Sequence, residues 1–200
     1  MSPWTPIAEA LSRPALQHET EGRTCAAVAA VLDRDWNLLF MARAQRPGDP
    51  WSGQLSFPGG RRDPGDKHLM DTAIRETREE VGLVLDPAQC IGPLDDLVTV
   101  RPIPDMLVRP FVFTVDEFGP LDLDPREVAG VHLHSLRHLL ANKDRDVFAR
   151  QWEGRRIELP RVQVGEAVLW GLTLQLVDDL LNRMDGGGTG VRRTRSSLSG

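Results

Sequence analysis

The chain has 200 residues, of which 40% are hydrophobic and 26% are charged, as expected for a globular protein with one main domain. Its formal net charge of −5 at pH 7 argues against a nucleic-acid scaffold, because nothing globally basic is available to neutralise phosphates. No segment approaches the roughly 20 consecutive apolar residues of a membrane span, and the N-terminus lacks the apolar run of a signal peptide. We therefore expect a cytoplasmic protein whose two cysteines, Cys25 and Cys90, are reduced core thiols.

The first part of the chain predicts a short helix followed by a β-hairpin. Residues 4–12 have the amphipathic pattern of a helix. Two apolar stretches, residues 23–32 and 36–43, flank a polar Asp-Arg-Asp turn, and this arrangement favours a hairpin. A loop rich in Pro and Gly covers residues 44–52 and leads to a short strand at 54–57.

The rest of the chain predicts a central helix, further strands and two more helices. In chain order, these elements are a helix at 69–81, strands at 89–100 and 107–115, and helices at 135–141 and 166–184. Strands on both sides of a central helix predict an α+β fold. We divide the chain into an N-terminal helical segment (1–21), a main domain (22–184) and a flexible basic tail (185–200).

Residues 57–83 carry the most informative pattern. On a helical wheel of about 100° per residue, Glu76, Glu79 and Glu80 share one face of the predicted helix, whereas Arg75 falls outside this face. Carboxylates at this spacing weaken a helix by about 0.2–0.5 kcal/mol per pair, so something other than the arginine must relieve their repulsion. A solvated acidic surface is one explanation. A divalent cation with oxygen ligands, Mg²⁺ or Mn²⁺, is the explanation that we favour.

Glycines on both sides of this helix favour the metal-binding explanation. Gly59 and Gly60 lie upstream, where the absence of a side chain lets the backbone approach a phosphate group closely. Gly82 follows the last glutamate and predicts the end of the helix. The acidic face therefore lies in a context that suits a phosphate-binding site.

The same segment resembles the Nudix box, in which a glycine, an acidic residue, an R-E pair, an E-E pair and a final glycine follow at set spacings. The matching residues are Gly60, Asp66, Arg75, Glu76, Glu79, Glu80, Gly82 and Leu83. Three departures stand out: Asp66 replaces a glutamate, Thr77 replaces an aliphatic residue, and the first half of the box has one extra residue. The resemblance implies an α/β/α sandwich with a mixed central β-sheet and Mg²⁺ as cofactor.

A box that is longer by one residue resembles the box of the coenzyme A pyrophosphatase branch. That branch also tends to show FPGG before the box and TA before R-E. Here these are residues 57–60 and 72–73. The upstream motif of that branch is matched at its ends by Arg43 and Gly53, and Arg46 is the nearest candidate for its second arginine. This resemblance implies a small nucleotide substrate such as coenzyme A, cleaved at its diphosphate to 3′,5′-ADP and 4′-phosphopantetheine.

Residue chemistry and resemblance together predict the site residues. We expect Glu76 and Glu80 to hold Mg²⁺, with Glu79 as a third ligand or proton acceptor, so that all three are catalytic. Substrate binding is predicted for the glycine pair and for arginines, whose guanidinium matches phosphate geometry. These residues are Arg43, Arg46, Gly59, Gly60, Arg61 and Arg75. For Glu127, in a PREV turn away from the box, a structural role and a metal-binding role both stay open.

Two other functions stay open at this stage. A Nudix hydrolase for ADP-ribose, a dinucleoside polyphosphate or a nucleoside triphosphate would keep the site and change the loops around it. A regulatory module that binds a nucleotide without cleaving it would have no reason to carry all three glutamates. Neither nucleic acid nor a membrane is an expected partner, and the sequence leaves open whether the protein is a homodimer.

Overall fold

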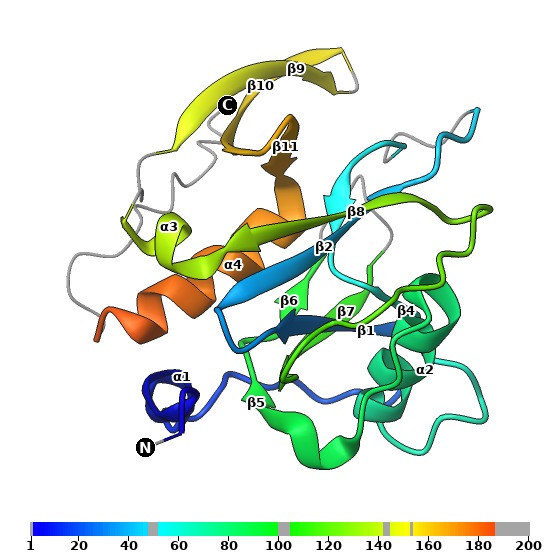
Figure 1. The fold of residues 1–200 in the computed structure, drawn as a ribbon. Helices are drawn as coiled ribbons and strands as arrows, with labels where there is room; N and C mark the ends of the chain where they lie inside the picture. Colours follow the sequence, from blue (N-terminus) through cyan, green and yellow to red (C-terminus); the bar gives the residue numbers. More distant parts are fainter. Residues whose placement is uncertain (1, 48–51, 100–104, 142–144, 153, 187–200) are drawn as a thin grey trace.

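The computed structural model describes residues 2–47, 52–99, 105–141, 145–152 and 154–186 (Figure 1). The elements in chain order are α1 (Thr5–Leu11), β1 (Cys25–Leu32), β2 (Asn37–Arg43), β3 (Leu55–Ser56), β4 (Gly59–Arg61), α2 (Leu69–Val81), a 3₁₀ turn (Pro87–Gln89), β5 (Cys90–Pro93), β6 (Leu97–Val98), β7 (Leu107–Thr114), β8 (Val128–Ser135), α3 (Leu136–Ala141), β9 (Asp146–Trp152), β10 (Arg155–Val164), β11 (Ala167–Trp170) and α4 (Gly171–Met184). No helix within these ranges is long and apolar enough to cross a membrane. The predicted tail lies almost entirely outside them, so it stays a prediction.

A mixed β-sheet forms the centre of the molecule. β1 runs parallel to β7 along its whole length and antiparallel to β4. β5 and β6 pair with β7, while β2 pairs with β3 and β8. The predicted hairpin of β1 and β2 is confirmed, but the two strands pair at Leu32 and Leu38 next to the turn, and beyond it each strand has other partners.

Helices cover both faces of this sheet, because the side chains of β1 are apolar in both directions. Ala27 and Ala29 lie in one core with Ala73 of α2. Ala30 and Leu32 point to the other face, into a core shared with α1 and α4. Successive side chains of a strand point to opposite faces, so an unbroken apolar strand indicates burial on both sides. The predicted α+β fold, an α/β/α sandwich with a mixed central sheet, is confirmed.

The predicted C-terminal helix of residues 166–184 is wrong in its first part. α4 begins at Gly171, and the four residues before it form β11, which pairs with β10. Gly171 has a φ of +70°, a left-handed conformation that favours glycine and separates the strand from the helix. Apolar side chains recur every four residues from Val168, a spacing that fits a helix. The same spacing also fits a strand, because every second side chain of a strand points to the same face.

The sequence does not predict the hairpin of β9 and β10, which forms a separate three-stranded sheet with β11 (Figure 1). Its paired positions mix charged and apolar residues: Arg150 lies opposite Ile157, and Arg161 lies opposite Asp146. Arg150 stacks over the ring of Trp170 at 4.6 Å. These contacts stabilise a strand without the clean alternation from which a strand is predicted.

The predicted strand of residues 89–100 is divided into the two short strands β5 and β6. In the loop between them, Asp95 accepts a hydrogen bond from the Leu16 N–H at 2.8 Å. Asp96 accepts one from the His18 N–H at 2.7 Å. The loop therefore leaves the sheet to hold the N-terminal segment, a contact between residues that are distant in the sequence.

Arg183 of α4 joins the same loop to the N-terminal segment. Its side chain is buried and pairs with Asp95 and, at 3.1 Å, with Asp179. The same guanidinium donates to the Arg13 carbonyl at 3.0 Å. Residues 5–18 thus pack onto the sandwich, while the predicted boundaries between the three parts of the chain stay predictions.

Replacing Arg183 with alanine should destabilise the whole fold. The change leaves Asp95 and Asp179 without their shared cation, and breaking a buried ion pair costs roughly 3 kcal/mol in the free energy of unfolding. Arg34→Ala is the matched control, because the side chains of Arg34 and its partner Asp116 are 64% and 78% exposed. Urea denaturation of both variants checks this, and equal losses of stability would contradict it.

Candidate active site

α2 and β4 bring the predicted glutamates and glycines together. β4 pairs antiparallel with β1, and α2 contacts both strands. The Gly59 N–H donates a hydrogen bond to Glu80 Oε2 at 2.8 Å. A Cβ atom at Gly60 would lie 2.5 Å from the carboxylate of Glu76. Both carboxylates therefore lie directly against the backbone of β4.

Gly59 is required where β4 pairs with β1. Its φ is +152°, and a Cβ atom there would lie 2.3 Å from the Ala27 carbonyl oxygen and 2.6 Å from Val28 Cα. Backbone atoms cannot move aside as the end of a flexible side chain can, so another residue would displace the strand. The glycine pair thus lets two strands and a helix meet closely, and its predicted contact with phosphate stays a prediction.

α2 spans Leu69–Val81, the range predicted from the sequence. At its start, the His68 N–H donates to the carboxylate of Asp71 at 2.8 Å. At its end, the Gly82 N–H donates to the Arg78 carbonyl at 3.1 Å, as the predicted terminating glycine should. The helix therefore presents its glutamates in a defined orientation.

Arg75 lies among the glutamates, contrary to the position expected from the helical wheel. Nη1 donates to Glu76 and to Glu79, in both cases at 2.9 Å. Nε and Nη2 donate to Asp66 at 3.1 and 3.0 Å, and Nη2 also donates to the Arg61 carbonyl at 3.2 Å. The wheel gives the direction of Cβ, whereas the guanidinium lies several bonds further out and reaches the next turn.

The expectation that the arginine cannot relieve the repulsion of the glutamates is therefore wrong for two of them. All five N–H donors of Arg75 are used inside the protein, so Arg75 acts here as a positioning residue for Glu76 and Glu79. In this arrangement Arg75 has no free N–H donor for its predicted contact with substrate. Among the described contacts, Arg75 does not reach Glu80, whose hydrogen bond comes from Gly59.

Buried hydrogen bonds explain two departures from the Nudix box. Asp66 accepts a hydrogen bond from the Thr72 hydroxyl at 2.9 Å, and its hydrogen bonds from Arg75 lower the pKa of Asp66 to about 2. The shorter acid is thus an anchor for Arg75. Thr77 is fully buried, and its hydroxyl donates to the Ala73 carbonyl at 2.7 Å, so a polar residue fits an apolar position.

The two innermost glutamates have raised pKa values. Burial raises the pKa of Glu80 to about 8; the Gly59 N–H opposes this rise, and the negative charges of Glu76 and Glu127 add to it. Burial likewise raises the pKa of Glu76, against the opposing hydrogen bond from Arg75. Both ionised forms are therefore disfavoured, and a nearby cation would stabilise both.

This donor set fits Mg²⁺ or Mn²⁺ bound by few protein ligands. In the described part of the chain, no three His, Cys, Asp or Glu side chains are arranged as a complete metal site. Mg²⁺ beside phosphates usually has one or two carboxylate ligands and completes its shell with water and substrate oxygens. Glu76 and Glu80, one helical turn apart, supply such a pair. Glu79 points to Arg75, and its role as a third ligand stays a prediction.

The loops beside the carboxylates carry further predicted residues. Arg43 ends β2, and its positive charge opposes the rise in the pKa of Glu80. Arg46 lies 3.6 Å from the carboxylate of Glu127 and donates to a backbone carbonyl of the same turn. The negative charge of Glu127 adds to the raised pKa of both inner glutamates, and its structural and metal-binding roles both stay open. Arg61 is exposed at the end of β4.

The fold and the site define a hydrolase of phosphate anhydrides: a buried and a half-buried glutamate lie against the glycine pair of β4 in a sheet between helices. The family model described as NUDIX domain matches residues 22–152, more than half of the chain. The chain belongs to the Nudix family, and it is a Nudix pyrophosphohydrolase.

Two similar proteins and one solved structure illustrate the relationship. The mitochondrial coenzyme A diphosphatase NUDT8 of Mus musculus is 32% identical over 148 residues, which are 70% of this chain and 67% of that protein. The Homo sapiens protein of the same name is 35% identical over 148 residues, 70% of this chain and 60% of that protein. The chain thus spans about two thirds or less of their length. A MutT/nudix family protein from Enterococcus faecalis has a TM-score of 0.57 at 17% identity, covering 85% of this chain and 65% of that one, which shows the fold alone.

Gly60→Ala should impair catalysis more than folding. The new methyl group would lie 2.5 Å from the Glu76 carboxylate, the end of a side chain that can rotate away and lose its position. We expect kcat to fall by roughly tenfold or more, with little change in melting temperature. The control is Gly65→Ala, whose Cβ would meet only Asp63 Oδ1 at 3.6 Å. Equal activities of the two variants would show that Glu76 does not need this contact.

Proposed function

We propose that this protein is a Mg²⁺-dependent pyrophosphohydrolase that cleaves the diphosphate of coenzyme A or its derivatives to 3′,5′-ADP and 4′-phosphopantetheine. The observation that carries the metal dependence is the pair of carboxylates, buried Glu80 and half-buried Glu76, against the glycines of β4. The substrate is supported by relatives named coenzyme A diphosphatase at 32% and 35% identity. Mn²⁺ is the alternative ion, because it also prefers oxygen ligands.

In this proposal the acidic residues hold the ion and handle the proton. Glu76 and Glu80 are the ligands, and Glu79 is a third ligand or the proton acceptor. A divalent ion bound there adds positive charge beside the phosphoryl oxygens and lowers the pKa of a water molecule. Arg75 keeps Glu76 and Glu79 in place through its hydrogen bonds, and Asp66 keeps Arg75 in place.

The substrate is held by cationic and backbone groups around these carboxylates. Arg43, Arg46 and Arg61 bind phosphate oxygens, since a guanidinium can donate two parallel hydrogen bonds to them. A diphosphate carries repelling negative charges, so neutralising them and aiming the attacking water supply most of the acceleration. A cytoplasmic location and the absence of nucleic-acid and membrane partners stay predictions from the sequence, and whether the protein is a homodimer stays open.

Neutral replacements of the two inner glutamates test the metal role. Glu76→Gln and Glu80→Gln keep the shape of the side chain and remove its charge, so we expect kcat at saturating Mg²⁺ to fall by at least about 10²-fold. The control is Glu117→Gln, which removes the same charge from an exposed position. Losses of only a few-fold in folded Glu76 and Glu80 variants would reject the role of these residues.

The same assay tests the substrate when it is run on a panel. Coenzyme A, ADP-ribose, a dinucleoside polyphosphate and a nucleoside triphosphate are incubated with the protein and Mg²⁺, and the products are separated by chromatography. We expect 3′,5′-ADP and 4′-phosphopantetheine from coenzyme A at the highest kcat/KM of the panel. A higher kcat/KM for another compound of the panel would reject coenzyme A as the preferred substrate. The proposed reaction, hydrolysis of a diphosphate, would still stand.

A further inference from the structure

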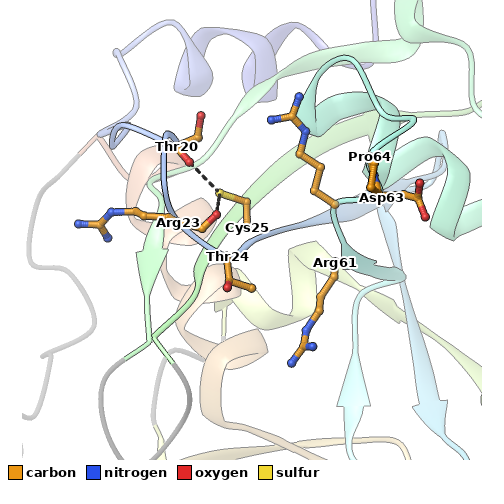
Figure 2. A pocket seen from close by; sticks show the side chains of 8 residues that line it. Thr20, Arg23, Thr24, Cys25, Arg61, Asp63 and Pro64 are labelled. Atoms are coloured by element: carbon orange, nitrogen blue, oxygen red, sulfur yellow. Dashed lines mark hydrogen bonds between the residues drawn. The ribbon is translucent and has the colours of Figure 1, made fainter.

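An open pocket of about 350 Å³ lies beside the end of β4. It forms between two segments that are distant in the sequence, the approach to β1 and the chain that follows the glycine pair (Figure 2). Its lining residues are Thr20, Arg23, Thr24, Cys25, Arg61, Arg62, Asp63 and Pro64. The roles assigned above use only Arg61 from this set.

The pocket is positively charged although the chain has a net charge of −5. Figure 2 shows Arg23 and Arg61 on opposite sides, with Thr24 and Cys25 between them. Arg62 donates to the Asp66 carbonyl at 3.1 Å and to the Lys67 carbonyl at 2.8 Å, contacts that fix its guanidinium without neutralising it.

The three arginines of the pocket have no carboxylate within ion-pair distance among the residues that the structure describes. The one acid in the lining is Asp63. It accepts a hydrogen bond from the Gly65 N–H at 3.0 Å, a contact within the turn that contains both residues. Arg23 and Arg61 are exposed, and their long side chains can turn toward an anion. Figure 2 draws the side chains of Arg23 and Arg61 pointing apart, so both would turn for their unpaired guanidinium groups to meet one oxyanion.

The backbone of the pocket is well ordered by its own hydrogen bonds. The Arg62 N–H donates to the Cys25 carbonyl at 2.9 Å and so joins the two walls. The Cys25 thiol donates to the carbonyls of Thr20 and Arg23 at 3.7 and 3.5 Å, which holds the turn before β1 (Figure 2). These contacts fix the backbone of the two walls, whereas the exposed side chains of Arg23 and Arg61 would turn toward an anion.

The pocket adjoins the inner glutamates through β4. Gly60 lies against Glu76, Arg61 is the next residue, and the Arg61 carbonyl accepts a hydrogen bond from Arg75. Consecutive Cα atoms are about 3.8 Å apart, so Arg62 begins within about 8 Å of Gly60. A substrate whose diphosphate lies at the glutamates could therefore place another group of the same molecule in this pocket.

We propose that the pocket binds a phosphomonoester of the substrate that is separate from the cleaved diphosphate. In coenzyme A this group is the 3′-phosphate of the adenosine, so the assignment rests on the proposed function for the identity of the substrate. A phosphomonoester carries between one and two negative charges near pH 7 and offers three acceptor oxygens, which suits Arg23, Arg61 and Arg62. Arg23 thereby becomes a specificity residue.

Calorimetric titration of the full chain with 3′,5′-ADP, 5′-AMP and inorganic phosphate tests the pocket without turnover. We expect 3′,5′-ADP to bind at least about tenfold more tightly than 5′-AMP, because a charge-assisted hydrogen bond is gained. Arg23→Ala should abolish most of this preference, and Arg23→Lys should restore part of it. Arg34→Ala is the control, since it removes the same charge more than about 20 Å away, beyond the other end of β1.

Three results would overturn the proposal: no preference for 3′,5′-ADP, equal preferences in the Arg23→Ala and Arg34→Ala variants, or inorganic phosphate binding as tightly as 3′,5′-ADP. The last result would assign the pocket to free phosphate. Hydrolysis of coenzyme A and of its 3′-dephospho form separates this proposal from the proposed function. Turnover of both forms with equal KM would reject the proposed role of the pocket and leave the proposed function unaffected. Absence of turnover with an Arg23-dependent preference in binding would reject the coenzyme A activity alone.

Discussion

The contact of two glutamates with a bare glycine backbone is the constraint on which the rest of the site depends. Glu80 is 4% exposed and accepts the Gly59 N–H, and Glu76 occupies the space that a side chain at Gly60 would fill. Carboxylates in this position have lost water and gained few donors, so a further positive charge would stabilise their ionised forms. The same absence of side chains lets α2 approach β4, so packing and chemistry share one cause.

Features that depend on local sequence could be predicted. The range of α2 follows from its helical periodicity and from Gly82. The burial of β1 on both faces follows from its unbroken apolar sequence. The neighbourhood of Gly60, Glu76 and Glu80 could also be anticipated, because a helix that follows a glycine pair so closely has few places to pack. For these elements, local periodicity and tertiary packing favour the same arrangement.

Features that depend on contacts distant in the sequence could not be predicted. A helical wheel gives the direction of a side chain but not its reach, so it misplaced Arg75 relative to Glu76. Glu127 comes near the glutamates because its turn docks on α2, where the Asp124 N–H donates to the Glu80 carbonyl at 2.9 Å. The β9–β10 hairpin was missed for a related reason: its cross-strand charge and ring contacts replace the alternation that marks a strand.

The central claim is that Glu76 and Glu80 together hold a divalent ion, and anomalous diffraction tests it most directly. Crystals of the full chain soaked in MnCl₂ should show a manganese peak about 2 Å from a carboxylate oxygen of each residue. The peak should be absent from crystals of a Glu76→Gln, Glu80→Gln double variant treated in the same way. Wild-type crystals with no manganese peak beside these two carboxylates would contradict the account.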